Sequence, residues 1–387
     1  MSLKNLLLGS LLSSFVVQAV ATPVIAARGQ YAKDALRKRA NLNVKRTTTT
    51  DTTTIDWVPI DSQGKIATPP PNIVSVAATN ASKPISELQQ PGAEVGPPGT
   101  VPIPQVDPDY LANVAEKGLP EIRSPKAKRQ YAGNHWYVTS NQNVANWGGK
   151  ATYSVYKAFV NNGGDFSLLQ TAVVKSNTNG GQTLEAGWIN YPNQVSQPHL
   201  FTYYTTNGYS SQGDNVGGWN QDVAGWVQYD SEIFPGTVFS PNSVDGGAQY
   251  EIEIQYLLYQ GNWWLWVLDR WIGYYPASLF SNGISGVTLA TGSDMIFYYG
   301  EIYQSEGPLT TTDMGSGEFG TTGFGHSAYI HNMVYTDTTG STYYDYTASF
   351  GDSDSARYNH QNVASSGTNW GSYVYLGGPG AGGVVGG

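Results

Sequence analysis

The sequence predicts an all-β protein: an antiparallel β-sandwich or jelly roll preceded by a largely extended leader. From residue 130 onwards, short runs rich in Val, Ile, Tyr, Trp and Thr alternate with Gly, Asn, Asp and Ser turns. No stretch of this body keeps a helical period. Many evenly spaced strands over residues 130–387 are typical of a sandwich or a jelly roll.

The expected strands follow one another along the body, separated by turn signals such as "NNGGD" (161–165), "NTNGG" (177–181) and "YQGNWW" (259–264). In chain order they are 152–160, 166–174, 183–189, 199–206, 224–229, 248–259, 262–268, 270–276, 295–303, 327–336 and 372–378. The glycine-rich end, "GGPGAGGVVGG" (377–387), is predicted to be flexible.

The first third of the chain has a different composition. Residues 1–21 combine Lys4, the apolar run "LLLGSLLSSFVV" and the small-residue site Ala19-Val20-Ala21, which predicts a secretory signal peptide and an extracellular protein. Thr-rich and Pro-rich tracts such as "VKRTTTTDTTT" (44–54) and "QQPGAEVGPPGTVPIPQ" (89–105) favour extended or disordered linker. Lys128-Arg129 stands where the composition changes, so we expect a processing site there.

These boundaries divide the chain into a signal peptide (1–21), a pro-segment (22–129) and a β-sandwich body (130–387). Residues 1–129 hold 15 Lys+Arg and 10 Asp+Glu, whereas residues 130–387 hold 5 and 19. The acidic body argues against nucleic acid or anionic membranes as partners. A basic leader would dock on the acidic body at neutral pH as an intramolecular inhibitor, and protonation below about pH 4.5 would weaken that attraction.

Several catalytic machineries are absent from the sequence. The chain has no cysteine, no GxSxG elbow, no HExxH and no P-loop, and we expect neither a metal nor another cofactor. The five histidines are scattered, and His326 and His331 are predicted to be surface or packed residues. Carboxylates therefore remain as the candidate catalytic groups.

Position separates these carboxylates into classes. Asp165, Asp214, Asp245 and Asp352 stand in turns and are predicted to be solvated. Four glutamates lie inside strands. Glu251 and Glu253 alternate with isoleucines, a pattern that predicts a strand with the isoleucines facing the core and the two glutamates facing solvent.

Glu185 in "TLEAGW" and Glu301 in "YYGEIY" have aromatic and glycine neighbours instead. A period of two places Glu301 on one face with Phe297, Tyr299 and Tyr303. Burial against aromatic rings favours the protonated form of a carboxyl, and two nearby carboxyls do not both ionise easily. One would hold a proton while the other acts as a base, the arrangement required for acid–base hydrolysis.

The body resembles the neprosin family of glutamic peptidases along almost its whole length. The stretches that carry the resemblance are "LEAGW" (184–188), "LFTYYTTNGY" (200–209), "GWVQ" (225–228), "GNWWL" (261–265), "IGYYPASLF" (272–280), "YYGEIY" (298–303), "DMGSGEFGTTGFGHSAYIHNM" (313–333) and "YVYLGGPG" (373–380). The leader before a dibasic pair resembles that family's activation segment, in the style of a fungal secreted zymogen.

The resemblance implies a β-sandwich peptidase with Glu185 and Glu301 as catalytic residues, active in acid and cleaving after proline in protein or peptide substrates. Gln228, Tyr203 and Trp188 are candidates for orienting the substrate, or else belong to the core. Tyr299 and Tyr303 are expected to form an apolar wall that could cradle a proline ring. Plant members carry cysteine pairs and this chain has none, so the resemblance does not define the shape of the loop 205–226, where one pair would sit.

Two readings of another class remain open. "YEIEIQY" (250–256) partly matches the Glu-x-Asp-x-x-Glu strand of concanavalin-like glucanases, but Glu253 stands in place of Asp and Tyr256 in place of the last Glu. A retaining glycosidase would need its carboxyls about 5 Å apart. A non-catalytic, sugar-binding wall protein with exposed Trp and Tyr is the other alternative. Nothing in the sequence indicates an obligate oligomer, so a monomer is expected.

Overall fold

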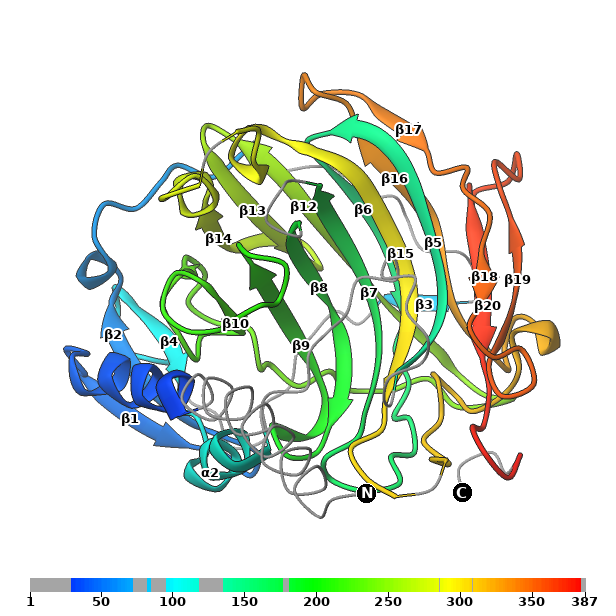
Figure 1. The fold of residues 1–387 in the computed structure, drawn as a ribbon, viewed down its shortest axis with the longest axis horizontal. Coiled ribbons are helices and arrows are strands. Elements are labelled where there is room, and N and C mark those ends of the chain that lie inside the picture. The colour runs from blue at the N-terminus through cyan, green and yellow to red at the C-terminus, as the bar shows by residue number, and fades with distance from the viewer. Residues whose placement is uncertain are drawn as a thin grey trace, which may run out of the picture.

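Two large antiparallel sheets face each other and curve together in the computed structural model of the chain (Figure 1). The structure describes residues 29–71, 82–84, 95–117, 135–176, 181–284, 286–307 and 309–383, with only the backbone for 82–84 and 115–117. The all-β sandwich predicted from the sequence is confirmed. In the described residues, no helix is long and apolar enough to cross a membrane.

The first sheet has seven strands in the order β10-β9-β8-β7-β15-β5-β18, and each pair of neighbours is antiparallel. Its strands are β5 (His135–Asn146), β7 (Phe166–Lys175), β8 (Gln182–Tyr191), β9 (Val195–Thr205), β10 (Gly217–Trp219), β15 (Ser293–Tyr303) and β18 (Gly351–Asp352).

The second sheet has the order β11-β14-β13-β12-β6-β16-β20-β19, with β17 added to β16 and β3 to β12. Its members are β3 (Ser82–Pro84), β6 (Gly148–Ser154), β11 (Val227–Gln228), β12 (Gln249–Tyr259), β13 (Asn262–Val267), β14 (Arg270–Pro276), β16 (Ala328–Thr336), β17 (Tyr343–Asp345), β19 (Asn359–Val363) and β20 (Tyr373–Gly377). Short 3-10 turns, η3 (Ala277–Phe280), η4 (Leu289–Thr291) and η5 (Gly320–Thr322), connect these strands.

Side chains that alternate along β8 and β15 show which face of the first sheet forms the core. Trp188 of β8 is fully buried and its indole N–H donates to the Ser154 carbonyl of the second sheet at 2.7 Å. Tyr298 of β15 donates its hydroxyl to the Val334 carbonyl, also in the second sheet, at 2.6 Å. Since alternate residues of a strand point to opposite faces, Glu185 and Glu301 project from the other face, away from the second sheet.

The chain passes from one sheet to the other between β5 and β6, at Gly148. Its φ of 131° lies in a region that favours glycine, and a Cβ there would stand 1.9 Å from the Tyr256 carbonyl oxygen. Glycine therefore allows β6 to pack closely on β12 immediately after the bend.

Apart from β3, which pairs with β12 of the second sheet, the described part of the leader forms regular structure on one flank of the sandwich, coloured blue and cyan in Figure 1. It contains a helix at 29–40, β1 (Arg46–Thr49), β2 (Thr54–Pro59), η2 (Ile60–Gln63), β4 (Thr100–Pro104) and α2 (Pro108–Lys117), with the strands in a sheet β1-β2-β4. Part of the Thr-rich tract that was expected as linker thus forms β1 and pairs with β2, where the Trp57 indole donates to the Thr48 hydroxyl at 2.9 Å. The predicted signal peptide and Lys128-Arg129 lie outside the described residues.

Asp165 was expected to be solvated in a turn, and this expectation is wrong. Its carboxylate is fully buried and accepts hydrogen bonds from the Ser305 N–H at 2.7 Å and from the Thr310 and Thr312 hydroxyls at 2.7 and 2.9 Å. The segment after β15 folds over the turn, a tertiary contact that local turn chemistry does not reveal.

Glu251 and Glu253 are also buried, at 3% and 8% exposure, so the predicted solvent-facing strand is wrong. They lie on the outer face of the second sheet, which the C-terminal part of the chain covers. Glu251 bonds to His331, on whose ring Trp370 stacks at 4.6 Å. Glu253 forms an ion pair with Lys150 at 3.4 Å.

Candidate active site

The register of the first sheet brings Glu185 and Glu301 to one face. β7 lies between β8 and β15, where Ala172 pairs with Glu185 and Leu168 pairs with Glu301. Directly opposed residues share a face, and so do residues 168 and 172 of one strand. Both glutamate side chains therefore project together from the outer face of this sheet.

The same register fixes how far apart the two glutamates stand. The backbone positions of the two glutamates differ by four residues along the strands, which is about 13 Å, and by two strand spacings across the sheet, which is about 10 Å. Tyr299 of β15 pairs with Gln170 of β7 midway between them. The two glutamate side chains therefore project from positions on either side of Tyr299, on the same face of the sheet.

Glu185 is fully buried and accepts four hydrogen bonds. Its Oε1 accepts from the hydroxyls of Tyr209 at 2.6 Å and Thr183 at 2.9 Å. Its Oε2 accepts from the Tyr299 hydroxyl and the Gln170 amide, both at 3.1 Å. Burial raises the pKa of Glu185 above its ordinary value, and these four bonds partly offset that rise. All four donors are neutral, so Glu185 can retain a proton where an exposed glutamate would lose it.

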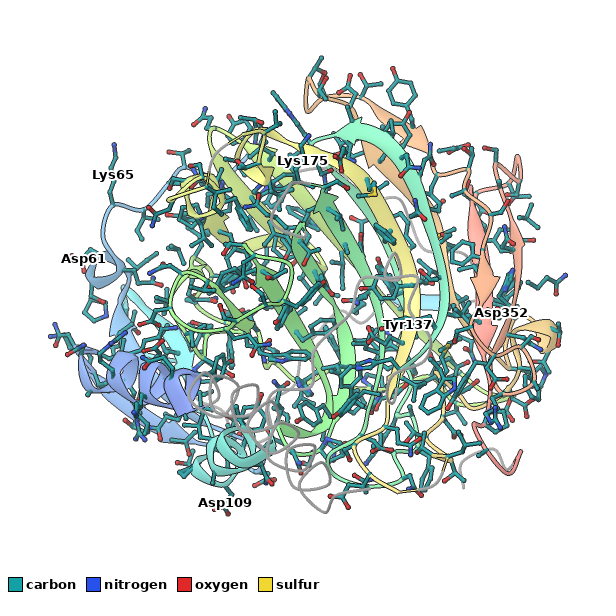
Figure 2. The ribbon with its side chains drawn as sticks, viewed as in Figure 1. Asp61, Lys65, Asp109, Tyr137, Lys175 and Asp352 are labelled. Atoms are coloured by element: carbon teal, nitrogen blue, oxygen red, sulfur yellow. The ribbon has the colours of Figure 1, made fainter. Side chains whose placement is uncertain are left out.

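Glu301 has a different environment. Its Oε1 lies 2.7 Å from Nδ1 of His135, the first residue of β5. The Glu301 side chain is fully buried and that of His135 is 10% exposed. The imidazole packs between rings, 4.8 Å from Tyr303, 6.2 Å from Tyr137 and 6.3 Å from Phe166. Tyr137, labelled in Figure 2, lies where β5 and β15 run side by side.

Tyr209 reaches Glu185 from the loop that follows β9. Its φ of 63° is unusual for a bulky residue and costs of order 1–3 kcal/mol. Thr205 accepts its backbone N–H at 3.0 Å, and its ring stacks on Tyr203 at 6.0 Å. A strained aromatic residue held against a buried carboxylate is typical of a functional site.

A model of the neprosin family matches residues 163–379, more than half of the chain. The chain belongs to the neprosin family. It is a peptidase of the glutamic type, which acts on proteins or peptides. Among solved structures it is similar to the crystal structure of Scytalido-glutamic peptidase with a peptide based transition state analog, at 9% identity and a TM-score of 0.33. That match covers 63% of this chain and 98% of the other.

Three of the residues predicted to contact the substrate of this neprosin-family chain lie on the face that carries the glutamates. Tyr203 pairs with Glu185 across β8 and β9, and Tyr299 donates its hydroxyl to Glu185. Tyr303 lies beyond Glu301, with its ring 5.3 Å from that of Phe166. Their position leaves the predicted role in substrate binding open.

The other two predicted residues do not face the glutamates. Trp188 points into the core between the sheets, since it stands an odd number of residues from Glu185 on β8. Gln228 is buried in β11 at the edge of the second sheet, where its amide donates to the Ile233 carbonyl at 2.7 Å and accepts from the Trp226 indole at 2.9 Å. Both side chains thus lie in the framework, which is the core position that the sequence left open for them beside substrate binding.

Among the described residues, four whose side chains bond to the two carboxyl groups were not predicted from the sequence: His135, Gln170, Thr183 and Tyr209. A polar residue amid the apolar run "FSLLQTAVV" was a signal for Gln170, and Tyr209 ends one of the stretches that carry the family resemblance. His135 had no local signal, because its contact with Glu301 depends on the pairing of β5 with β15.

The glycines beside the two glutamates serve packing. A Cβ at Gly187 would stand 2.0 Å from the Leu169 carbonyl oxygen of the neighbouring strand. A Cβ at Gly300 would stand 2.6 Å from Leu376 and 2.8 Å from Met314. Close contact within the protein therefore accounts for glycine at both positions.

No group of three His, Asp or Glu side chains that could hold a metal ion occurs within the described ranges. A cavity of about 800 Å³ lies between the leader and the body, lined by residues such as Lys38, Gln63 and Trp226. It contains neither glutamate. We assign this cavity to the seam between leader and body, and the candidate site to the glutamate-bearing face.

Proposed function

We propose that the chain is a secreted, acid-active endopeptidase, made as a zymogen, that cleaves after proline and uses Glu185 and Glu301 to activate water. The observation that carries this proposal is the placement of these two glutamates. They stand in the family motifs, fully buried, on the same face of one sheet. We further propose that it acts extracellularly as a monomer.

In the proposed mechanism one glutamate is ionised and the other is protonated. The ionised carboxylate takes a proton from water as the water oxygen attacks the scissile carbonyl carbon. The protonated partner donates a hydrogen bond to the developing oxyanion and then gives its proton to the leaving amine as the C–N bond breaks. Exchange of protons with solvent restores the starting state.

The contacts between leader and body support a zymogen. The helix at 29–40 lies against the loop 205–226, where Arg37 forms an ion pair with Asp214. The Tyr31 hydroxyl donates to Asp222 at 2.8 Å, and the buried Lys38 ammonium donates to the Gln221 carbonyl. This loop carries Tyr209, whose hydroxyl donates to Glu185. Removal of the leader would therefore free the loop that supplies this hydrogen bond. Both glutamates are inaccessible to solvent in the full chain. A substrate can reach them only after the residues that cover them move away.

The preference for proline is supported by the aromatic surroundings of the pair. Tyr137, Tyr299 and Tyr303 stand near Glu301, and a flat pyrrolidine ring packs well on such rings. The same rings would accept other apolar side chains, so the cleavage pattern must be measured.

The test maps the cuts that the secreted chain makes in an unstructured, proline-containing protein at about pH 4, near the reference pKa of glutamate. Fragment ends are identified by mass spectrometry for the wild type and for Glu185→Gln and Glu301→Gln. Cuts after proline that both substitutions abolish are expected. Cuts elsewhere that still need both glutamates would discard the specificity, and cuts that survive both substitutions would overturn the proposal.

The carbohydrate-active alternative gains no support from the structure. Glu251 and Glu253, the residues of the partial glucanase match, bond to His331 and Lys150 under the C-terminal part of the chain. They are fixed in structural pairs on the face opposite the core.

A further inference from the structure

The contact between His135 and Glu301 distinguishes the two glutamates from each other. His135 is the diagonal neighbour of Glu301 across β5 and β15, since Tyr137 pairs with Glu301 and His135 with Tyr303. A separation of 2.7 Å between Nδ1 and Oε1 is that of a charge-assisted hydrogen bond. The rings around the imidazole hold it in this orientation.

Acidic solution changes the charge of this contact. An imidazole with a reference pKa of about 6.5 is cationic in acid when a carboxylate lies beside it. The imidazolium then favours the ionised form of Glu301 at a pH where an isolated glutamate takes up a proton. The titratable groups that face the pair in the described residues are phenols, Tyr137 and Tyr303 beside the imidazole and Tyr299 beside Glu301, and these stay neutral in acid.

The bonded partners of Glu185 do not favour its ionised form in this way. Its partners are two phenols, a hydroxyl and an amide, and none of them gains a positive charge in acid. As the pH falls, Glu185 is thus the glutamate that takes up a proton first. The two environments separate the protonation states of the pair, which is how enzymes divide acid and base roles between two carboxyls.

We propose that His135 is a positioning residue that keeps Glu301 ionised in acid, which makes Glu301 the base that activates water and Glu185 the acid that protonates the leaving amine. This inference rests on the proposed function. His135 lies outside the residues 163–379 that match the family model, so the match itself assigns it no role.

The experiment measures kcat and KM of the secreted chain from pH 2.5 to 7 for the wild type, His135→Asn and His135→Phe. Asn keeps an N–H near the position of Nδ1 without a titratable charge, and Phe keeps the packing of the ring. We expect the acidic limb of kcat/KM to move up by about one to two pH units. Near pH 3 kcat/KM would fall about 10- to 100-fold, chiefly through kcat, and near pH 6 less than about 3-fold.

A matched control separates this effect from lost stability. His331 also contacts a buried glutamate and packs on an aromatic ring, but on the outer face of the second sheet. His331→Asn is expected to lower thermal stability and leave the pH profile unchanged. An unshifted limb in both His135 variants, or an equal loss of activity at every pH, would overturn the assignment.

Glu301→Gln in the same assay distinguishes the failure of this inference from failure of the proposed function. If Glu301→Gln remains active, the proposed catalytic pair is wrong. If it is inactive while His135 variants keep the wild-type profile, only the role of His135 is wrong. Should those variants not fold, NMR titration of His135 in the Glu185→Gln chain decides instead. The midpoint of the His135 titration should lie at least about one pH unit higher in the Glu185→Gln chain than in the chain that carries both Glu185→Gln and Glu301→Gln. Equal midpoints in the two chains would contradict the proposal.

Discussion

The described part of the chain contains two buried glutamate–histidine pairs, one on each sheet, and they differ in what surrounds them. Glu301 and His135 lie on the outer face of the first sheet, and Glu251 and His331 on the outer face of the second. In both pairs a carboxylate oxygen lies about 3 Å from a ring nitrogen, at 2.7 and 3.1 Å, and both glutamates are nearly inaccessible.

The difference lies beyond the pair itself. On the first sheet a second buried glutamate projects from the same face, and Tyr299 reaches from the strand of Glu301 to the carboxylate of Glu185. On the second sheet the next acid along the strand, Glu253, is neutralised by Lys150. A buried glutamate–histidine contact is thus compatible with a purely structural role. A second carboxyl with a different proton affinity is what makes hydrolysis possible.

The largest expected effect separates the two pairs directly. Glu301→Gln should lower kcat about 10²- to 10⁴-fold, because it removes a group that transfers a proton in the reaction. Glu251→Gln should keep kcat within about twofold and lower the free energy of unfolding by about 1–3 kcal/mol, since a buried hydrogen bond is disturbed. Steady-state kinetics at acidic pH and urea unfolding measure these quantities. A greater loss of kcat in Glu251→Gln than in Glu301→Gln would exchange the roles of the two sheets.

A tyrosine that donates a hydrogen bond to a buried glutamate on each sheet gives the second, smaller contrast. Tyr209 donates to Glu185 at 2.6 Å and Tyr329 donates to Glu251 at 3.2 Å. The Tyr209 bond lowers the pKa of Glu185, so Tyr209→Phe should raise that pKa and move the alkaline limb of the kcat profile to higher pH. We expect kcat to fall about 10-fold.

Tyr329→Phe is the control for the loss of a hydroxyl. It should leave the kcat profile in place and cost about 1 kcal/mol of stability, the usual net value of one hydrogen bond. An alkaline limb that does not move in Tyr209→Phe would show that Glu185 is not the proton donor.

The contrast between the sheets also marks how far the sequence could predict the molecule. Strand periodicity and turn residues were sufficient to predict the all-β sandwich. The aromatic and glycine neighbours of Glu185 and Glu301 in the sequence distinguished these two residues from the acids in turns. The burial of Glu251 was not predictable, because the residue that closes over its partner, Trp370, is distant in the sequence.

The same limit applies within the site. His135 reaches Glu301 only through the pairing of β5 with β15, and Asp165 is buried only through contact with the segment after β15. Periodicity reports which face a side chain takes. It does not report which distant segment covers that face.

Another buried acid, Asp222, extends the comparison to the boundary between leader and body, and it opposes the prediction from net charge. Burial raises the pKa of Asp222 to about 6 from an ordinary value of 3.8, despite the hydrogen bond from Tyr31 and the charge of Lys38. The stability that this group contributes is therefore complete below pH 3.8 and is lost as the pH rises through about 6. Acid favours this contact, whereas the charge count predicts that acid loosens the leader.

Asp222→Asn should remove that dependence, because Asn resembles the protonated acid and still accepts from Tyr31. In a Glu185→Gln background, which prevents self-cleavage, the variant should gain up to about 3 kcal/mol of unfolding free energy over the wild type at pH 7 and almost none at pH 3.5. Asp214→Asn breaks the exposed pair with Arg37 and should cost little at either pH. Urea unfolding of the full chain measures all three. If Asp222→Asn changes the unfolding free energy equally at pH 7 and pH 3.5, net charge remains the dominant control of leader docking. The leader would then be released in acid.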